Sequence, residues 1–239
     1  MYANADLENL EPTPVKITDC IFKENSADYG GAVEIWGSVA VLRSSFLANQ
    51  ANQRFGALST DAYSTYSTVR DSLFVGNRAR DIGTIGYGAL LLENSTLAFN
   101  ESTEKGGIVE HNDSALYIPP NCSLDIRNSV FWNNAVPANL LGHPDCEVFT
   151  VEHSNVQGGH PGTGNLNLDP LFVDATGGDF RLSVNSPLRD VGNKNLLSLD
   201  PDDEDDDHNI NERRPYDRSK APRLVGSEVD MGAYEFQTE

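Results

Sequence analysis

The stretch that decides the fold reads Ile17-Thr18-Asp19-Cys20-Ile21-Phe22-Lys23-Glu24-Asn25. Each later copy keeps an aliphatic residue, a polar residue, a small Ser or Cys, a Phe or Leu, and a final Asn. The copies occupy residues 41–49, 69–77, 92–100 and 126–134, with a degenerate sixth at 151–159. Successive Phe or Leu positions are 23 to 34 residues apart, and a period of this size is typical of solenoid proteins.

The composition of the repeats indicates strands rather than helices. They are rich in Val, Ile, Phe, Ser, Thr, Asn and Gly, the residues of short strands and tight corners. A helical solenoid would need two amphipathic helices in each repeat. We therefore expect an all-β chain, a right-handed parallel β-helix of about six rungs over residues 15–160, closed by an irregular C-terminal cap.

The spacing within one copy predicts a sharp corner. Ile17, Cys20 and Phe22 do not follow one strict alternation, so all three can point inward only if the chain bends at Asp19. Asn, Asp and His tolerate the left-handed backbone that such a bend requires. The equivalent residues of the other copies are Arg43, Asp71, Asn94, Asn128 and His153, of which only Arg43 breaks the pattern.

The final Asn is the same in the first five copies. Stacked strands lie about 4.8 Å apart, so equivalent amides can bond from rung to rung as a ladder. The alternative is a plain turn residue, and both roles are structural. Cys20 takes the small-residue position of the first copy, while Cys122 and Cys146 could pair as a disulfide or remain free.

Charge narrows the range of partners. The net charge is −19 and the pI is about 4.5, which disfavours nucleic acid and anionic lipid surfaces. An anionic polysaccharide would need a bridging divalent cation. The sequence contains no stretch of about 18 apolar residues, the length that would predict a transmembrane helix. Residues 1–14 lack a signal peptide, and we interpret them as the remnant of a preceding segment or linker.

Two groups of motifs resemble known families. Phe22-x-x-Asn25 followed by Gly31-Ala32 resembles the FxxN and GGA repeats of polymorphic membrane proteins, which are bacterial surface β-helices. Residues 161–239 resemble the end module of secreted bacterial β-helix proteins of the choice-of-anchor type, and the matching stretches are 167–174, 178–182 and 229–236. The resemblance implies an extracellular or cell-surface location within a longer exported protein.

One position departs from that module. The family has an Asp-rich turn with glycine before a Pro-Arg pair. Here Ser219 and Lys220 replace the usual Asp-Gly, although Asp217, Pro222 and Arg223 are present. We therefore do not carry over any ion site that this turn makes elsewhere in the family.

The acidic loop at 200–212 is a candidate cation site. Closely spaced carboxylates can supply the oxygen ligands of calcium, although this loop lacks the glycine and distal Glu of an EF-hand. The residues we expect as ligands are Asp202, Asp203, Asp205 and Asp207. The alternative is a solvated loop of like charges without an ion.

Carbohydrate contacts are predicted on the outer surface of the coil. Trp132 follows an inward Phe, so it should point outward and could stack on a sugar ring. Arg70 and Arg127 recur just before the corner and could face a sugar acid. The alternative is that these are ordinary outward side chains.

The leading functional hypothesis is a non-catalytic scaffold of an extracellular or cell-surface bacterial protein, adhesive or carbohydrate-binding. Its partner would be a polysaccharide or another cell-surface ligand, and the sequence does not indicate an oligomeric state. The signatures of polygalacturonase-type hydrolases do not occur. The alternative is a pectate-lyase-like lyase or a glycoside hydrolase, with its site partly in rungs that precede this chain.

Overall fold

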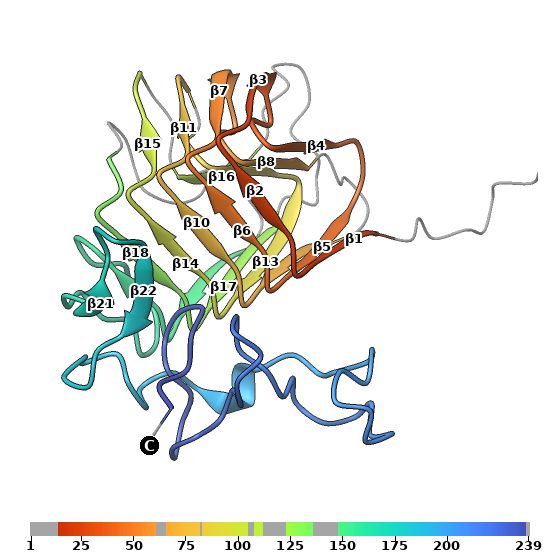
Figure 1. The fold of residues 1–239 in the computed structure, drawn as a ribbon, viewed down its shortest axis with the longest axis vertical. Helices are drawn as coiled ribbons and strands as arrows, with labels where there is room; N and C mark the ends of the chain where they lie inside the picture. Colours follow the sequence, from red (N-terminus) through yellow and green to blue (C-terminus); the bar gives the residue numbers. More distant parts are fainter. Residues whose placement is uncertain are drawn as a thin grey trace, which may run out of the picture.

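The computed structural model describes residues 14–60, 66–81, 83–104, 108–111, 123–135 and 148–237. In these ranges the chain is all-β apart from one turn of 3₁₀ helix, η1 (Lys194–Leu196). It winds into a solenoid of stacked parallel sheets (Figure 1), which confirms the predicted β-helix. Cys122, Cys146 and residues 1–13 lie outside the described residues.

Four parallel sheets form the sides of the coil. Sheet A contains β1 (Val15–Thr18), β5 (Val39–Leu42), β9 (Ser67–Arg70), β13 (Ala89–Glu93), β17 (Ser123–Arg127) and β19 (Val148–Glu152). Sheet B contains β2 (Ile21–Lys23), β6 (Ser45–Leu47), β10 (Leu73–Val75), β14 (Thr96–Ala98), β18 (Val130–Trp132) and β20 (Asn155–Val156). Sheet C contains β3 (Ser26–Tyr29), β7 (Gln50–Arg54), β11 (Arg78–Ala79) and β15 (Glu101–Ser102). Sheet D contains β4 (Val33–Ile35), β8 (Leu58–Thr60), β12 (Ile85–Tyr87) and β16 (Val109–His111).

The number of rungs depends on the side of the coil. Sheets A and B have six strands, whereas sheets C and D have four among the described residues. Four coils are therefore complete on all four sides, compared with the predicted six. The sequence motif lies only on sheets A and B, so counting motifs counts those two sides.

The repeat sets the register. Phe22, Phe46, Phe74, Leu97, Phe131 and Val156 pair in this order along sheet B. The rings of Phe22 and Phe46 stack at 4.9 Å, and those of Phe46 and Phe74 at 4.5 Å. Together with the inward residues of sheet A they form one continuous apolar core. The predicted inward face is confirmed.

The corner between sheets A and B has left-handed backbone in every rung. All six predicted corner residues have φ between 43° and 55°. Arg43, the exception in the sequence pattern, has φ 43° like the others. A non-glycine residue in this conformation costs roughly 1–2 kcal/mol, so the corner must be held by other contacts.

Serine hydroxyls hold this corner. The hydroxyl of Ser72 donates to the carbonyl of Arg70 at 2.7 Å, which closes the bend. The backbone N–H of Ser72 donates to the hydroxyl of Ser95 in the next rung at 3.2 Å. The same pair of bonds recurs at Ser44, Ser95 and Ser129. The small polar residue of the motif is therefore required by the corner itself.

Asparagine amides form a second ladder, as one of the two sequence interpretations predicts. Asn77 Nδ2 donates to Asn100 Oδ1 at 2.9 Å and to the carbonyl of Phe46 at 2.9 Å. Its Oδ1 accepts from both the backbone N–H and the Nδ2 of Asn49. Equivalent bonds join Asn25 to Asn49 and Asn100 to Asn134. Each interior amide is thus saturated by its neighbours.

A second left-handed corner, between sheets B and C, was not predicted. It lies one residue before each ladder Asn, at Glu24, Ala48, Gly76, Phe99 and Asn133, with φ between 52° and 64°. These residues share no chemistry, so the sequence pattern gives no signal. The backbone there is fixed by the Asn ladder next to it.

The C-terminal segment first closes the last rung and then turns back. Leu166 accepts from Val156 N–H at 2.9 Å and donates to the carbonyl of Ser154 at 2.9 Å. The antiparallel pair β21 (Phe172–Asp174) and β22 (Asp179–Leu182) follows, with Phe172 and Phe180 packed on the outer side of sheet B. Residues 163–168, at the start of the predicted C-terminal module 161–239, therefore pair with the last rung and cover it.

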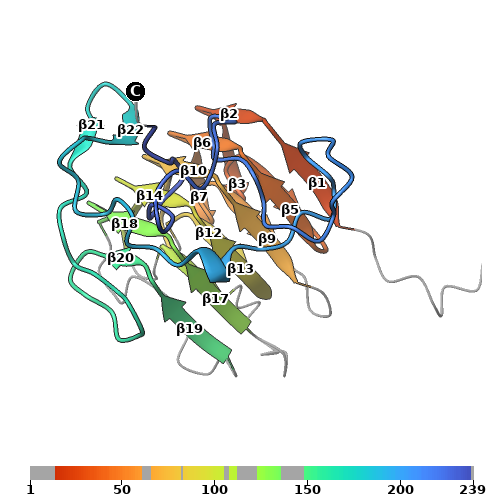
Figure 2. The same cartoon turned by 90° about the horizontal axis from the view of Figure 1, so that it is seen from below.

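The rest of this segment runs along the corner of sheets A and B from the last rungs to the first (Figure 2), and then returns to the fourth and fifth rungs. Its path is fixed by contacts of Asn193 with Asn128, Ser198 with Glu93, Glu204 with Arg43, and Asp202 with Lys16. The end-module motif at Gly232 and Ala233 packs on β14 and β18. The N–H of Ala233 donates to Thr96 Oγ1 at 3.0 Å.

Loss of one ladder amide should destabilise the whole solenoid. Asn77→Ala leaves the N–H and Nδ2 of Asn49 without their acceptor in a fully buried position, which should lower the free energy of unfolding by roughly 2–4 kcal/mol. Urea unfolding followed by circular dichroism measures this. Asn52→Ala, at an exposed strand position, is the matched control and should change stability by less than about 0.5 kcal/mol. Equal effects of the two substitutions would contradict the ladder.

Glycine at the second corner should stabilise the protein. Ala48 is exposed with φ 52°, and Gly76 fills the same corner of the next rung. Ala48→Gly should therefore raise the free energy of unfolding by about 1 kcal/mol. Ala51→Gly, at a buried strand position, should lower it by about 1 kcal/mol or more. A loss of stability in Ala48→Gly would disprove the strain at this corner.

Candidate functional site

Charged residues along the corner of sheets A and B find their partners on the C-terminal segment. Arg43 is 6% exposed, and its Nε donates to Asp19 Oδ1 at 2.9 Å while its Nη1 contacts Glu204. Glu204 also contacts Arg214, and Lys220 Nζ lies 3.0 Å from Asp19 Oδ2. Buried charges are tolerated only when paired in this way. This network fixes the segment to the first two rungs.

Arg70, predicted to face a sugar, belongs to the same interface. Its Nε donates to Ser198 Oγ at 3.1 Å and lies 3.8 Å from Glu93 Oε2. Glu93 is fully buried and accepts from the N–H of Ser198 at 2.8 Å. Burial lowers the pKa of Arg70, and the charge of Glu93 opposes that shift. This geometry gives Arg70 a structural role, and sugar binding by it stays a prediction.

Arg127 shares a row of sheet A with Arg70, with Glu93 between them, whereas Trp132 lies on sheet B. Arg127 Nε donates to Asp125 Oδ1 at 3.0 Å on sheet A, two strands away from Arg70. Trp132 points outward from sheet B as expected, but it is half-buried against a cluster that contains Leu182, Leu188 and Met231. The structure therefore places the two predicted arginines in one row and Trp132 on another sheet, and sugar binding by the three stays a prediction.

Asp71 and Arg223 form a fully buried pair in the third rung. Arg223 Nε lies 3.8 Å from Asp71 Oδ1, and its Nη2 donates to the carbonyls of Asp230 and Gly232 at 3.0 and 2.7 Å. Burial raises the pKa of Asp71 to about 7, although Arg223 opposes the shift. Both groups are shielded from solvent, so their role is to hold the C-terminal segment.

The Asp-rich turn near Asp217 binds its own backbone. Asp217 Oδ1 accepts from Ser219 N–H at 2.8 Å and from Ala221 N–H at 2.9 Å, and its Oδ2 accepts from Glu235 N–H at 2.9 Å. Lys220 has φ 65°, a left-handed conformation that glycine adopts without strain. Both oxygens of this carboxylate therefore accept backbone hydrogen bonds, which fix the turn and attach it to the chain end.

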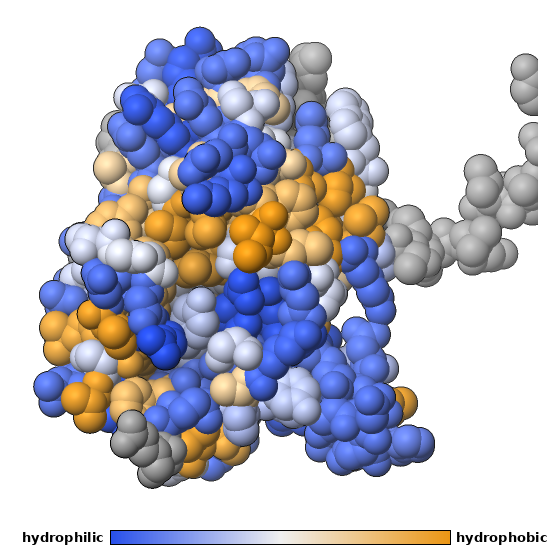
Figure 3. All heavy atoms as spheres, in the orientation of Figure 1, coloured by the Kyte–Doolittle hydropathy of each residue, from blue (hydrophilic) through white to orange (hydrophobic). Residues whose placement is uncertain are grey.

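The acidic loop 200–212 is closed at its base by backbone hydrogen bonds. Asp200 N–H donates to the carbonyl of Glu212 at 3.0 Å, and Arg214 N–H donates to that of Ser198 at 3.1 Å. Figure 3 shows the loop as part of a hydrophilic lobe at the lower right of the molecule. Asp202 accepts from Lys16 Nζ at 2.7 Å, and this hydrogen bond lowers the pKa of Asp202.

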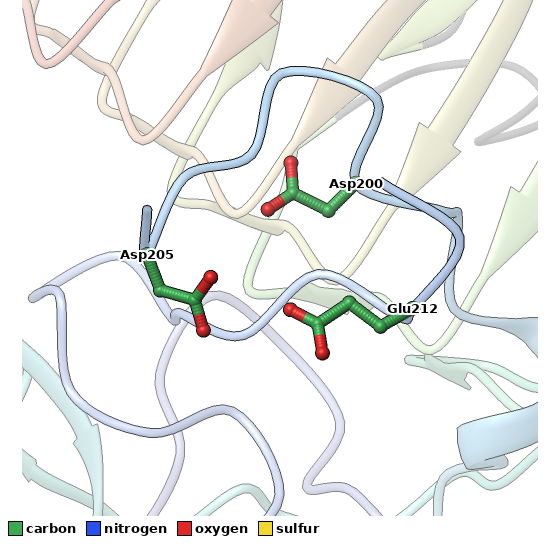
Figure 4. A group of neighbouring side chains, drawn as sticks. All are labelled: Asp200, Asp205 and Glu212. Atoms are coloured by element: carbon green, nitrogen blue, oxygen red, sulfur yellow. The ribbon is translucent and has the colours of Figure 1, made fainter. Parts of the chain in front are cut away.

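Two overlapping groups of carboxylates lie in this loop. Oxygens of Asp203, Asp205 and Asp207 lie within 4.8 Å of one another, as do oxygens of Asp200, Asp205 and Glu212. Figure 4 shows the second group, with the three side chains directed toward a common centre. Oxygen donors of this kind suit a hard divalent cation.

Three of the four predicted calcium ligands are therefore brought together, while Asp202 is paired with Lys16 instead. The sequence prediction did not include Asp200 and Glu212. They are 12 positions apart and become neighbours only because the loop closes at its base. Whether either group binds an ion stays a prediction at this point.

A groove crosses the outer side of sheet C and was not predicted. It has a volume of about 410 Å³, and its exposed polar lining residues are Gln50, Asn52, Arg78, Arg80, Thr103 and Glu104. Arg80 Nε lies 3.4 Å from Glu104 Oε2, and Arg78 Nε lies 3.5 Å from Glu101 Oε2. This side is on the opposite edge of the coil from the C-terminal segment (Figure 1).

Comparison with known proteins yields no match to a family model, to a curated protein or to a solved structure. The resemblance to bacterial surface proteins therefore rests on the quoted motifs alone, and bacterial origin and location stay predictions. Within the described ranges, no helix has the length and apolar character needed to cross a membrane.

The buried Asp71 should leave a distinct mark on the pH dependence of stability. Its pKa is about 3.9 in an unfolded chain and about 7 in the folded protein. The folded state therefore binds more protons between pH 4 and 7, and this group's contribution to the free energy of unfolding falls as pH rises through that range.

Asp71→Asn should remove that contribution, because the Asn side chain resembles the neutral acid and does not titrate. The corner accepts Asn, since Asn94 occupies the equivalent position in the next rung. Between pH 4.5 and 7.5, wild type should lose about 3 kcal/mol more unfolding free energy than the variant. Urea titrations at the two pH values measure the difference. Burial also raises the pKa of Glu235 to about 7. Glu235 is present in both proteins, so its contribution cancels in the comparison. Parallel pH profiles would refute the assignment.

Proposed function

We propose that this chain is a non-catalytic β-helix scaffold that presents the groove on sheet C to a carbohydrate on a cell surface or in the extracellular space. The observation that carries the proposal is the row of exposed amide, guanidinium, hydroxyl and carboxylate groups on one side of the coil. Figure 3 shows that side, at the top of the molecule, as hydrophilic.

The chemistry of the groove favours sugars over apolar ligands. Pockets for drug-like molecules are mostly apolar, whereas Gln50, Asn52 and Arg78 supply several hydrogen-bond donors and acceptors. Consecutive rungs repeat every 4.8 Å or so, so the donors recur along the rod as hydroxyls recur along a polymer. The serine and asparagine ladders keep the groove rigid, which reduces the entropy lost on binding.

The same groove supports binding rather than cleavage. Glycoside hydrolysis uses a pair of carboxyl groups placed on either side of the scissile bond. Among the described lining residues, Glu104 is the one carboxylate, and it is paired with Arg80. The alternative function is a pectate-lyase-like lyase or a glycoside hydrolase, with its site partly in rungs that precede this chain.

Charge suggests which sugars bind. With a net charge of −19 the protein repels anionic polymers, so we infer that the preferred ligand is a neutral polysaccharide or an acidic one bridged by calcium. An extracellular location agrees with the resemblance to bacterial surface proteins and completes the proposal.

Binding should depend on the two groove arginines. We expect the chain to bind one or more polysaccharides in a panel of neutral and acidic polymers, tested with and without calcium, and to release no new chain ends. Arg78→Ala/Arg80→Ala should weaken binding by about tenfold or more, because two charge-assisted hydrogen-bonding groups are lost. Biolayer interferometry and a reducing-end assay provide the two readouts.

Arg181→Ala is the matched control, because Arg181 is also an exposed arginine in an ion pair, with Asp179 on β22. Both variants should keep wild-type stability within about 1 kcal/mol. Binding equal to wild type in the double variant, or no binding across the panel, would overturn the proposed face. Release of chain ends would replace the scaffold with an enzyme.

A further inference from the structure

The base of the acidic loop holds three buried carboxylate oxygens without hydrogen-bond donors. They are Asp200 Oδ1, Asp205 Oδ1 and Glu212 Oε1. The whole side chain of Asp200 is inaccessible to solvent. These three residues form the group in which one carboxylate oxygen of each lies within 4.8 Å of those of the others, and their side chains face a common centre (Figure 4).

In Asp200 and Glu212, the second carboxylate oxygen accepts a hydrogen bond that holds the side chain in place. Asp200 Oδ2 accepts from Glu204 N–H at 2.7 Å, and Glu212 Oε2 accepts from Asn209 Nδ2 at 3.4 Å. These bonds leave Asp200 Oδ1 and Glu212 Oε1 without a hydrogen-bond donor. The carboxylates of Asp200 and Glu212 are thus oriented before any ion arrives, which favours binding.

Nearby protein charge does not compensate for this burial. The cation paired with Asp200 among the described residues is Arg214, whose Nη1 lies 3.8 Å from Asp200 Oδ1, beyond hydrogen-bond distance. That same Nη1 contacts Glu204. Burying ionised carboxylates without a counter-charge is costly. Burial raises the pKa of both Asp200 and Glu212, and the charges of Asp205 and Asp207 raise that of Glu212 further.

We propose that Asp200, Asp205 and Glu212 bind a calcium ion at the base of the loop. The donors are all oxygens, which suit Ca²⁺ and Mg²⁺ better than zinc or copper, whose protein sites use His or Cys. Calcium accepts six to eight oxygens in flexible geometry, so water can complete the shell around these three carboxylates. Magnesium gives up its waters reluctantly and usually binds through only one or two carboxylates, so it gains less than calcium from three fixed protein oxygens.

The ion would lock the loop onto the solenoid. From this loop, Glu204 contacts Arg43 and Asp202 contacts Lys16, on the first two rungs. Because Asp200 and Glu212 lie at opposite ends of the loop, an ion between them fastens its base. Calcium should then stabilise the folded state in proportion to its concentration. This inference does not depend on sugar binding, and either can fail alone.

Calorimetric titration of the full chain with CaCl₂ and MgCl₂, at about pH 7.5, tests the site. We expect one calcium ion with a Kd on the order of 10⁻⁴–10⁻³ M, as in extracellular calcium modules, and weaker magnesium binding. The thermal unfolding midpoint should rise with calcium. Glu212→Gln and Asp205→Asn should weaken binding by about tenfold or more. Lower pH should also weaken calcium binding, because protons compete with calcium for the carboxylates of Asp200 and Glu212, whose pKa values are raised.

Two controls make the outcome decisive. Asp206→Asn removes the same charge from an exposed position of the same loop and should keep calcium affinity within about threefold. Asp203→Asn/Asp207→Asn should retain binding, which separates the two carboxylate groups. Glu212 is only half-buried, so its variant should fold, as circular dichroism would verify. No effect of calcium on wild type at about 10 mM, or unchanged affinity in Glu212→Gln, would overturn the proposal.

Discussion

Hydrogen bonding between equivalent residues of successive rungs is the constraint on which the rest of this structure depends. Ser72 and Asn77 each bond to the same residue type in the next rung, and each also bonds a backbone carbonyl of its own or the preceding rung. These bonds compensate for the left-handed backbone at both corners, a conformation that is strained for most residues other than glycine. A change of register by one residue would break both ladders and expose the stacked Phe rings.

Fixed corners also determine what the outer surfaces can do. Every rung has its two left-handed corners, between sheets A and B and between sheets B and C, at equivalent positions. Outward residues of sheet C therefore lie in rows, and the groove lined by Arg78 and Arg80 follows from that alignment. Parallel strands repeat at a nearly constant spacing, so such rows are rigid and regular. A surface of this kind suits a repeating polymer better than a small compact ligand.

The C-terminal segment contributes a different chemistry. It attaches to the corner through paired charges, including Arg43 with Glu204 and Asp71 with Arg223, and to the outer side of sheet B through apolar clusters. Ion pairs of this type fix position and register more than they add stability. The acidic loop is the part of the segment where negative charge exceeds the cations around it, and for that reason a divalent ion can act there as a structural link.

The sequence by itself determined the coil: the repeat of Phe, Ser and Asn predicted the inward face, the first corner and the amide ladder, because these are local patterns at a fixed spacing. It also indicated that Asp203, Asp205 and Asp207 belong together. Only the tertiary structure decided that the chain turns back over sheets A and B, pairing Arg70 with Glu93 and Ser198, and packing Trp132 against apolar residues of that segment. Only closure of the loop brought Asp200 to Glu212. Contacts between residues far apart in sequence leave no periodic trace, because each is made once and depends on where the rest of the chain has already packed.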